Sequence, residues 1–120
     1  MLFGSAVNAW QRPIADVGPA GADAGRGGKY LFLPPAYDGT VPDGYFPVPT
    51  DTYTVLVALR PIARNGGTLA ETVAYAQTMK VYPLGKPEAA GRYIDAFPLA
   101  WDTLPRYDLS FFADLAAIID

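Results

Sequence analysis

Carboxylates are the side chains that could carry acid–base chemistry in this sequence, because its 120 residues include no histidine and no cysteine. Without those two residue types the chain by itself has no thiol nucleophile, no disulfide, no imidazole base and no zinc site built on them. General acid and base roles would then fall to aspartate or glutamate. The candidates are spread along the chain: Asp16, Asp38, Asp43, Asp51, Asp95 and Asp102.

Two of these aspartates need a partner if they are buried. Asp16 lies just beyond the end of a predicted strand, and Asp95 lies inside an otherwise apolar predicted strand. A buried carboxylate is paired or hydrogen-bonded, so we expect an ion pair with Arg12, Arg60 or Arg92 rather than a catalytic role. No segment has the alternating acidic spacing of a calcium loop, and the sequence predicts neither a metal site nor a cofactor.

Aromatic side chains make up 13% of the chain and fall mostly at strands and strand ends. Most of them are expected to fill a β core, whereas Trp10 and Tyr37 flank turns, where they could also contact an organic ligand. Trp101 belongs to the same aromatic set. The expected ligand-binding residues are these two turn aromatics and the charged residues near them or at a strand end: Trp10, Arg12, Asp16, Tyr37 and Arg60.

A glycine-rich segment, Gly18–Gly28, superficially resembles a phosphate-binding loop because it leads into Lys29. Such a loop needs glycine where this chain has Asp23, and serine or threonine where it has Tyr30. The segment also precedes a predicted strand, so no helix amino terminus is available to receive a phosphate. We therefore expect a flexible surface connection between two strands.

The charge pattern argues against two classes of partner. Nine Lys and Arg against 12 Asp and Glu give a net charge of −3, and the basic residues are scattered singly. Nucleic acid would require a clustered positive surface, so we expect none to bind. No apolar run approaches the roughly 20 residues that span a bilayer, and the amino terminus lacks the features of a signal peptide. We therefore do not expect the chain to span a membrane.

Glycine and proline, 12 of each, favour short strands and turns over long helices. The run Tyr53–Leu59 is apolar on both alternating faces, which predicts a central strand covered on both sides. Thr68 and Glu71 match a capping box at the start of a helix after the Asn65 turn, and Asp108 is a suitable amino-terminal cap for a second helix. The predicted class is mainly β with two helices (α+β), with strands at Leu2–Trp10, Lys29–Leu33, Thr40–Pro42, Tyr45–Val48, Tyr53–Leu59 and Arg92–Ala96 and a first helix over Leu69–Lys80.

Seven separated segments, in order, resemble the family known as domain of unknown function 1254. They are Ala9-Trp-Gln-Arg-Pro13, Asp16-Val-Gly-Pro-Ala-Gly-Ala-Asp23, Gly25-Arg-Gly-Gly-Lys-Tyr-Leu31, Leu33-Pro-Pro-Ala-Tyr-Asp-Gly39, Val41-Pro-Asp-Gly-Tyr45, Val81-Tyr-Pro-Leu84 and Tyr107-Asp-Leu-Ser-Phe-Phe112. The resemblance implies a jelly-roll-like β-sandwich, preceded by a longer amino-terminal portion and followed by a partner domain of unknown function 1214. Residues 1–120 are therefore expected to be one incomplete domain, a fragment of a two-domain bacterial protein.

The resemblance transfers no catalytic residues, because the family has no agreed activity. Family members often carry export signals, which favours a periplasmic or secreted location for the parent protein. We expect a structural or small-ligand-binding β module whose partners are the missing amino-terminal segment and the carboxy-terminal domain. The alternative is part of an enzyme, such as a hydrolase, whose catalytic site needs segments absent from this chain and to which Arg12, Asp16 or Arg60 contributes. Alone, the chain should self-associate through exposed strand edges.

Overall fold

The computed structural model describes residues 1–63, 66–89, 91–100, 102 and 104–119. Within them the fold is mixed α+β, with five strands in two small sheets and two α-helices. The predicted turn at Asn65 and the predicted aromatic role of Trp101 lie outside the described residues. In chain order the elements are β1 (Leu2–Asn8), β2 (Pro13–Val17), β3 (Lys29–Leu33), β4 (Tyr45–Pro49), β5 (Val55–Pro61), α1 (Leu69–Ala76), the short 3-10 helix η1 (Pro87–Ala89) and α2 (Ser110–Ile119).

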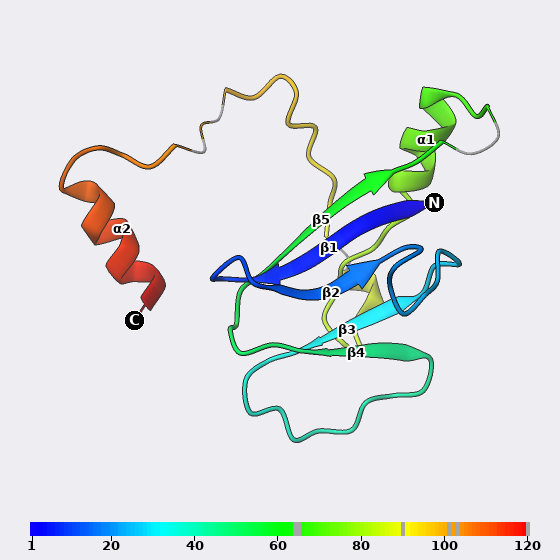
Figure 1. The fold of residues 1–120 in the computed structure, drawn as a ribbon, viewed down its shortest axis with the longest axis horizontal. Helices are drawn as coiled ribbons and strands as arrows, with labels where there is room; N and C mark the ends of the chain where they lie inside the picture. Colours follow the sequence, from blue (N-terminus) through cyan, green and yellow to red (C-terminus); the bar gives the residue numbers. More distant parts are fainter. Residues whose placement is uncertain (64–65, 90, 101, 103, 120) are drawn as a thin grey trace.

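The first sheet is antiparallel with the order β2-β1-β5, and the second is the parallel pair β3-β4 (Figure 1). β1 is the central strand of its sheet, and its Ala6 is fully buried. The β1–β2 pairing shifts register between Ala6 and Val7, whereas the β1–β5 pairing runs without interruption from Leu2–Pro61 to Asn8–Val55. The two edges of this sheet therefore differ in regularity.

Two strand predictions near this sheet were wrong. The sequence predicts no strand over Pro13–Val17, where β2 forms; proline is accepted as the first residue of an edge strand, where no ladder amide is needed. The apolar run in β5 was predicted to be central, but β5 is an edge strand and the Leu56 side chain is 62% exposed. Apolar residues on both faces of a strand predict that it is buried, but they do not show which other element buries it.

The predicted short strand Thr40–Pro42 does not form, and those residues belong to the connection between β3 and β4. The predicted strand Arg92–Ala96 is also absent. The Tyr93 hydroxyl donates to the carbonyl oxygens of Ala76 and Met79, at 2.7 and 2.5 Å. Ala76 is the last residue of α1 and Met79 lies in the turn after it, so Tyr93 binds the region where helical partners run out.

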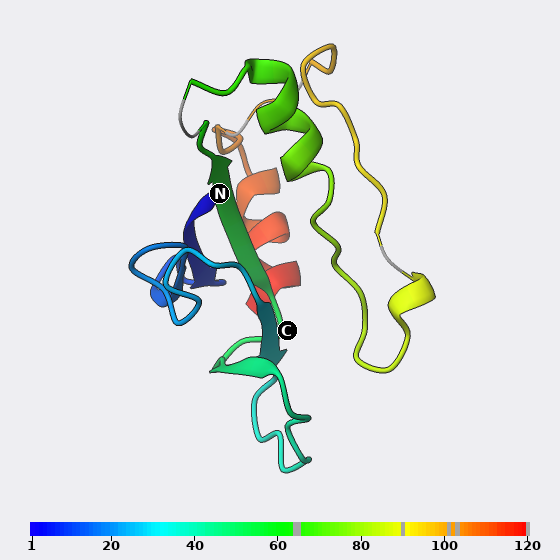
Figure 2. The same ribbon diagram turned by 90° about the vertical axis from the view of Figure 1, so that its right-hand side faces the viewer.

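Helix α1 begins as the sequence predicts. Thr68 Oγ1 accepts from the Glu71 amide at 3.2 Å and Glu71 Oε2 accepts from the Thr68 amide at 2.7 Å, so the capping box is confirmed. The helix ends at Ala76, four residues before the predicted Lys80, because the amides of Thr78 and Met79 bond three residues back and tighten the chain into turns. Figure 2 shows the chain running from α1 to η1 and then returning toward the end of the molecule where α1 lies.

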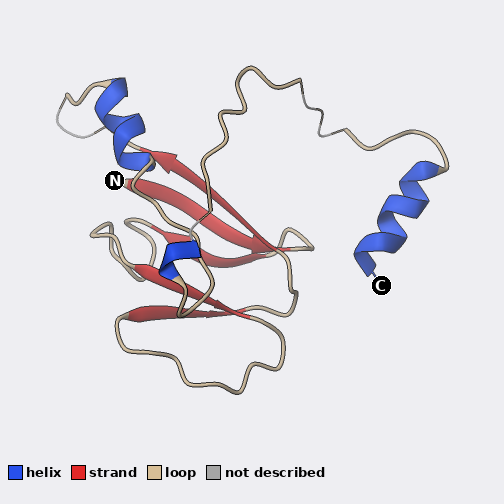
Figure 3. Ribbon diagram, turned by 180° about the vertical axis from the view of Figure 1, so that it is seen from behind, coloured by secondary structure: helices blue, strands red, loops and turns tan. Residues whose placement is uncertain are grey.

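Helix α2 lies apart from both sheets at the end of an extended segment (Figures 1 and 3). Asp108 Oδ1 accepts from the Ser110 amide at 2.7 Å, which confirms the predicted cap. On α2 itself Phe112 is 63% exposed, and Leu109, just before the helix, is 84% exposed. The apolar face of α2 is therefore not packed against the strands.

The core of the described part is small. Ala6 and Val48 are its fully buried apolar residues, whereas 24 large apolar side chains are exposed. The Tyr30 and Phe46 rings, 5.3 Å apart, pack within the β3–β4 sheet. The described strands close no barrel.

Candidate functional site

Asn8, the last residue of β1, organises the connection between β1 and β2. Its side chain is almost completely buried, and its Oδ1 accepts from the backbone amides of Trp10 and Arg12 at 3.0 and 2.9 Å. Its Nδ2 donates to Asp51 Oδ1 at 2.8 Å. Because one buried carboxamide satisfies two loop amides, the turn after β1 is fixed by a side chain as well as by backbone bonds.

Asp51 joins this turn to the segment before β5. Arg12 Nη2 donates to Asp51 Oδ2 at 2.7 Å, and the Ala9 amide donates to Thr52 Oγ1 at 3.1 Å. The Asn8 carboxamide, together with the Arg12 guanidinium, lowers the pKa of Asp51 below its ordinary value. The β1–β2 hairpin is therefore held against the Asp51–Thr52 turn by three hydrogen bonds.

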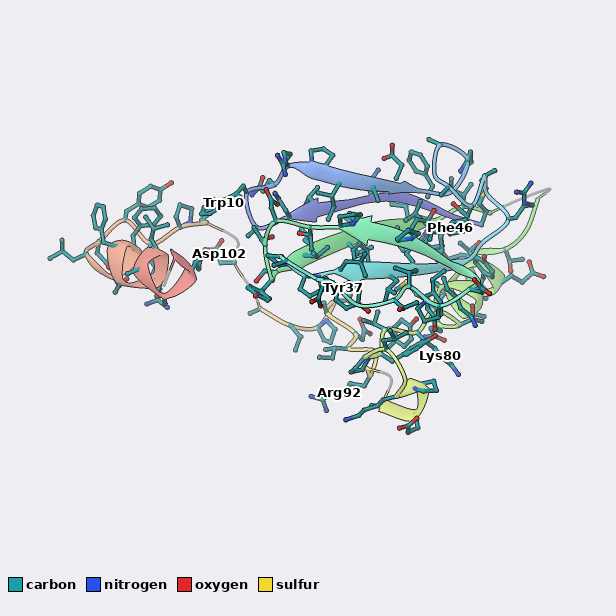
Figure 4. All side chains as sticks on the ribbon, turned by 90° about the horizontal axis from the view of Figure 1, so that it is seen from below. Trp10, Tyr37, Phe46, Lys80, Arg92 and Asp102 are labelled. Atoms are coloured by element: carbon teal, nitrogen blue, oxygen red, sulfur yellow. The ribbon has the colours of Figure 1, made fainter. Side chains whose placement is uncertain are left out.

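Trp10 stands at the tip of this hairpin with 62% of its surface exposed, and Figure 4 shows it at the end of the sheet. Gln11, the next residue, adopts a left-handed backbone with φ 58°, which completes the turn. The Arg12 side chain is 65% exposed and uses only one guanidinium nitrogen on Asp51. An exposed indole and an Arg with unused donors thus lie two residues apart on a braced turn, an arrangement that can stack on a flat ligand and hydrogen-bond an anion.

The other three sequence-predicted ligand residues do not join this cluster. Tyr37 lies in the β3–β4 connection, where its hydroxyl donates to the Thr40 carbonyl oxygen at 3.1 Å, and Figure 4 shows it well away from Trp10. Asp16 is an exposed residue of β2, and Arg60 pairs with Phe3 near the opposite end of β1 from the hairpin. Of the five predicted residues, Trp10 and Arg12 are the two that lie in the connection between β1 and β2.

The expected ion pairs of Asp16 and Asp95 are wrong. Arg12 pairs with Asp51, which the sequence offered only as one carboxylate among several. Asp95 Oδ1 accepts from the Phe97 amide at 3.0 Å, so the carboxylate stabilises a local turn and is not part of a buried ion pair. Asp16 is exposed and needs no compensating cation.

A second cluster, which sequence reasoning missed, forms around Asp23 in the glycine-rich segment. Asp23 is only 3% exposed; its Oδ1 accepts from the Gly18 amide and the Tyr30 hydroxyl, both at 2.7 Å. Its Oδ2 accepts from the Gly27 amide at 3.0 Å. Burial acts to raise the pKa of Asp23, but the hydrogen bonds from Tyr30, Gly18 and Gly27 outweigh it and the pKa is lowered.

This cluster corrects the view of Gly18–Gly28 as a flexible connection. The Tyr30 hydroxyl also donates to the Asp16 carbonyl oxygen at 3.2 Å, so it links the segment to both β2 and β3. The amides that a phosphate would need are directed at the Asp23 carboxylate instead. A lone acidic residue inside a glycine run, followed by a tyrosine, was the sequence signal available for this role.

A third contact ties the segment after α1 to the second sheet. The hydroxyl oxygens of Tyr45 and Tyr82 lie 3.5 Å apart, and this hydrogen bond raises the pKa of Tyr45. Lys29 Nζ lies 5.4 Å from the centre of the Tyr45 ring, within cation–π range. The pair fixes the position of Tyr82 and thereby the path of the chain beyond α1.

A family model described as "Protein of unknown function (DUF1254)" matches residues 1–83. The chain belongs to this family. The DUF1254 match includes all five strands and α1, and hence the Asn8 and Asp23 clusters; the resemblance at Tyr107–Phe112 lies beyond it. No curated protein matches the chain. None of the helices in the described part is long and apolar enough to cross a membrane.

Proposed function

We propose that this chain is a small-ligand-binding β module of a two-domain bacterial protein and that its β1–β2 hairpin is the recognition element. The observation that carries the proposal is the Asn8–Asp51 brace, which holds an exposed tryptophan and an exposed arginine on one short turn. Trp together with Arg is the composition typical of binding hot spots.

The ligand that suits this turn is a small planar organic anion. The Trp10 indole offers a flat apolar face, and the Arg12 guanidinium keeps donors that Asp51 does not use. A carboxylate of the ligand would accept from those donors while its ring stacks on the indole. Bracing by Asn8 reduces the conformational entropy lost on binding.

We further propose that the two sheets belong to a larger jelly-roll-like β-sandwich in the parent protein. The support is the family assignment together with the many apolar side chains on the described strands that are exposed, such as Leu56 and Phe3. In that arrangement the amino-terminal segment and the partner domain of the parent would cover faces that the described residues leave uncovered.

The binding proposal is tested by titrating the chain with benzoate and 2-naphthoate while following tryptophan fluorescence. Trp10 becomes the only reporter in a Trp101→Phe background, because the chain has two tryptophans. We expect saturable quenching that is stronger for the larger ring and that Arg12→Ala weakens about tenfold, the loss typical of one charged hydrogen bond.

The matched control is Arg60→Ala, which removes an exposed arginine from the other end of the sheet and should leave the titration unchanged. Equal loss in both variants, with circular dichroism unchanged, would contradict a site at the hairpin. Unsaturable quenching would contradict binding altogether.

A further inference from the structure

The two edges of the β2-β1-β5 sheet are protected to different degrees. β2 is short, begins with Pro13, pairs through a register shift, and lies next to the second sheet through the Tyr30–Asp16 hydrogen bond. β5 pairs with β1 over seven regular positions, and within Val55–Leu59 it carries no charge, proline or bulge at its free edge. Natural sheets usually protect an exposed edge strand with charges, prolines or bulges. An edge without them indicates a strand that pairs with another strand in the working protein.

The free hydrogen-bonding groups on β5 follow from its pairing with β1. The Ile62 amide donates to the Met1 carbonyl oxygen at 2.8 Å, so Ile62 faces β1. Because facing alternates along an antiparallel strand, Ala58 also faces β1, whereas the amides and carbonyls of Val55, Val57 and Leu59 point outward. Within the described part of the chain, no backbone group bonds to these three residues from outside the sheet.

We propose that this edge pairs antiparallel with β5 of a second copy of the chain, about a two-fold axis at Val57. In this register Val57 faces its own counterpart, Val55 faces Leu59, and Leu56 faces Ala58. Each outward pair exchanges two backbone hydrogen bonds, about six in all. The three-stranded sheet then continues across the axis into an identical three-stranded sheet.

The sequence of β5 is complementary to itself in this register. Its apolar residues meet apolar residues on both faces, and Arg60 falls opposite Thr54, so polar meets polar at each end. Shifting the axis by one residue, to Ala58, would set Arg60 against Leu56 and draw Pro61, which has no amide, into the ladder. The pairing would also cover Leu56 and Val57, now 62% and 38% exposed.

The oligomeric state of the full chain tests the proposal. Light scattering after size exclusion should give twice the chain mass of 12.8 kDa. Val57→Pro should raise the dimer dissociation constant by more than about tenfold, because it removes an outward amide while leaving the bonds to β1 intact. Val57→Thr keeps the amide and the β-branched shape, and it should remain dimeric.

Cross-linking tests the register independently of the proline variant. The chain has no cysteine, so Val57→Cys should form an intermolecular disulfide on oxidation, because the paired Cα atoms would lie about 5.5 Å apart. Val55→Cys is the matched control: its two copies would lie four residues apart along the strands, about 13 Å, and should not cross-link.

Three results would overturn the proposal. A monomer at all concentrations would mean that this edge is free or is covered by another segment of the parent protein. A dimer that persists in a folded Val57→Pro variant would place the interface elsewhere. Equal cross-linking of Val55→Cys and Val57→Cys, or a continuous range of larger species, would indicate unspecific association.

Discussion

The side-chain Nδ2 of Asn8 donates to Asp51 Oδ1 at 2.8 Å and so joins two turns that are 43 residues apart in the chain. Asn8 is 2% exposed, whereas Asp51 is on the surface beside Arg12. One buried carboxamide therefore fixes both the hairpin that presents Trp10 and the turn that leads into β5. The first prediction concerns its removal.

Asn8→Ala should lower the free energy of unfolding by about 1–3 kcal/mol, because the amides of Trp10 and Arg12 lose their common acceptor. Urea unfolding measures the change. Asp43→Ala is the control: Asp43 is exposed and its side chain makes no hydrogen bond within the described residues, so its effect should stay within about 0.5 kcal/mol. Equal effects of the two substitutions would contradict a bracing role for Asn8.

Tyr30→Phe should destabilise the fold by about 1–2 kcal/mol, since Asp23 loses a hydroxyl donor in a buried place. Tyr37→Phe removes a comparable hydroxyl from an exposed connection, where water replaces the lost bond to Thr40, and should change stability by less than about 0.5 kcal/mol. Thermal unfolding compares the two variants. If their midpoints fall equally, the Asp23 cluster does not stabilise the fold.

Acid should destabilise the protein through Asp23 and Asp51. Their folded-state pKa values lie below the ordinary 3.8, so the native state holds these protons more weakly than the unfolded state does. The resulting stability is present above about pH 4 and is lost as the pH falls through the folded-state values. Unfolding in urea between pH 7 and pH 2 should show this loss.

The matched variant is Asp23→Asn, which keeps an acceptor oxygen but does not titrate. Its stability should depend less steeply on pH below 4 than that of the parent sequence. An unchanged slope in Asp23→Asn would show that Asp23 does not contribute to the acid transition.

Gly4→Ala should destabilise the first sheet by about 2 kcal/mol or more, because the added Cβ would overlap the Ala58 carbonyl oxygen on β5. The backbone cannot yield there without separating β1 from β5. Gly91→Ala is the control, since its Cβ would meet only the Val81 carbonyl oxygen at 3.7 Å, an ordinary contact. Urea midpoints of the two variants should differ accordingly; a tolerated Gly4→Ala would argue that β5 is not held tightly against β1.

Several elements follow from the sequence because their causes are local. Alternating and β-branched residues define β1, β3 and β5, and the capping box fixes the start of α1, since its partners are three residues apart. The family was also recognisable from short segments such as Ala9–Pro13, and the match over residues 1–83 confirms it. Trp10 and Arg12 lie on the same hairpin for a local reason too, because they are near neighbours in the chain.

The tertiary structure alone decided what depends on distant partners. Arg12 pairs with Asp51 rather than with Asp16. The Asn8 side chain holds the Asp51 carboxylate beside the hairpin, although Asp51 is 39 residues from Arg12 in the chain. β5 is an edge strand of its sheet. Its apolar faces predict that it is buried, but they do not determine which strand lies beside it. Asp23 became a buried centre because folding directs two glycine amides and the Tyr30 hydroxyl at it. Hydrogen bonds between distant residues leave no periodicity in the sequence, so only the folded chain reveals them.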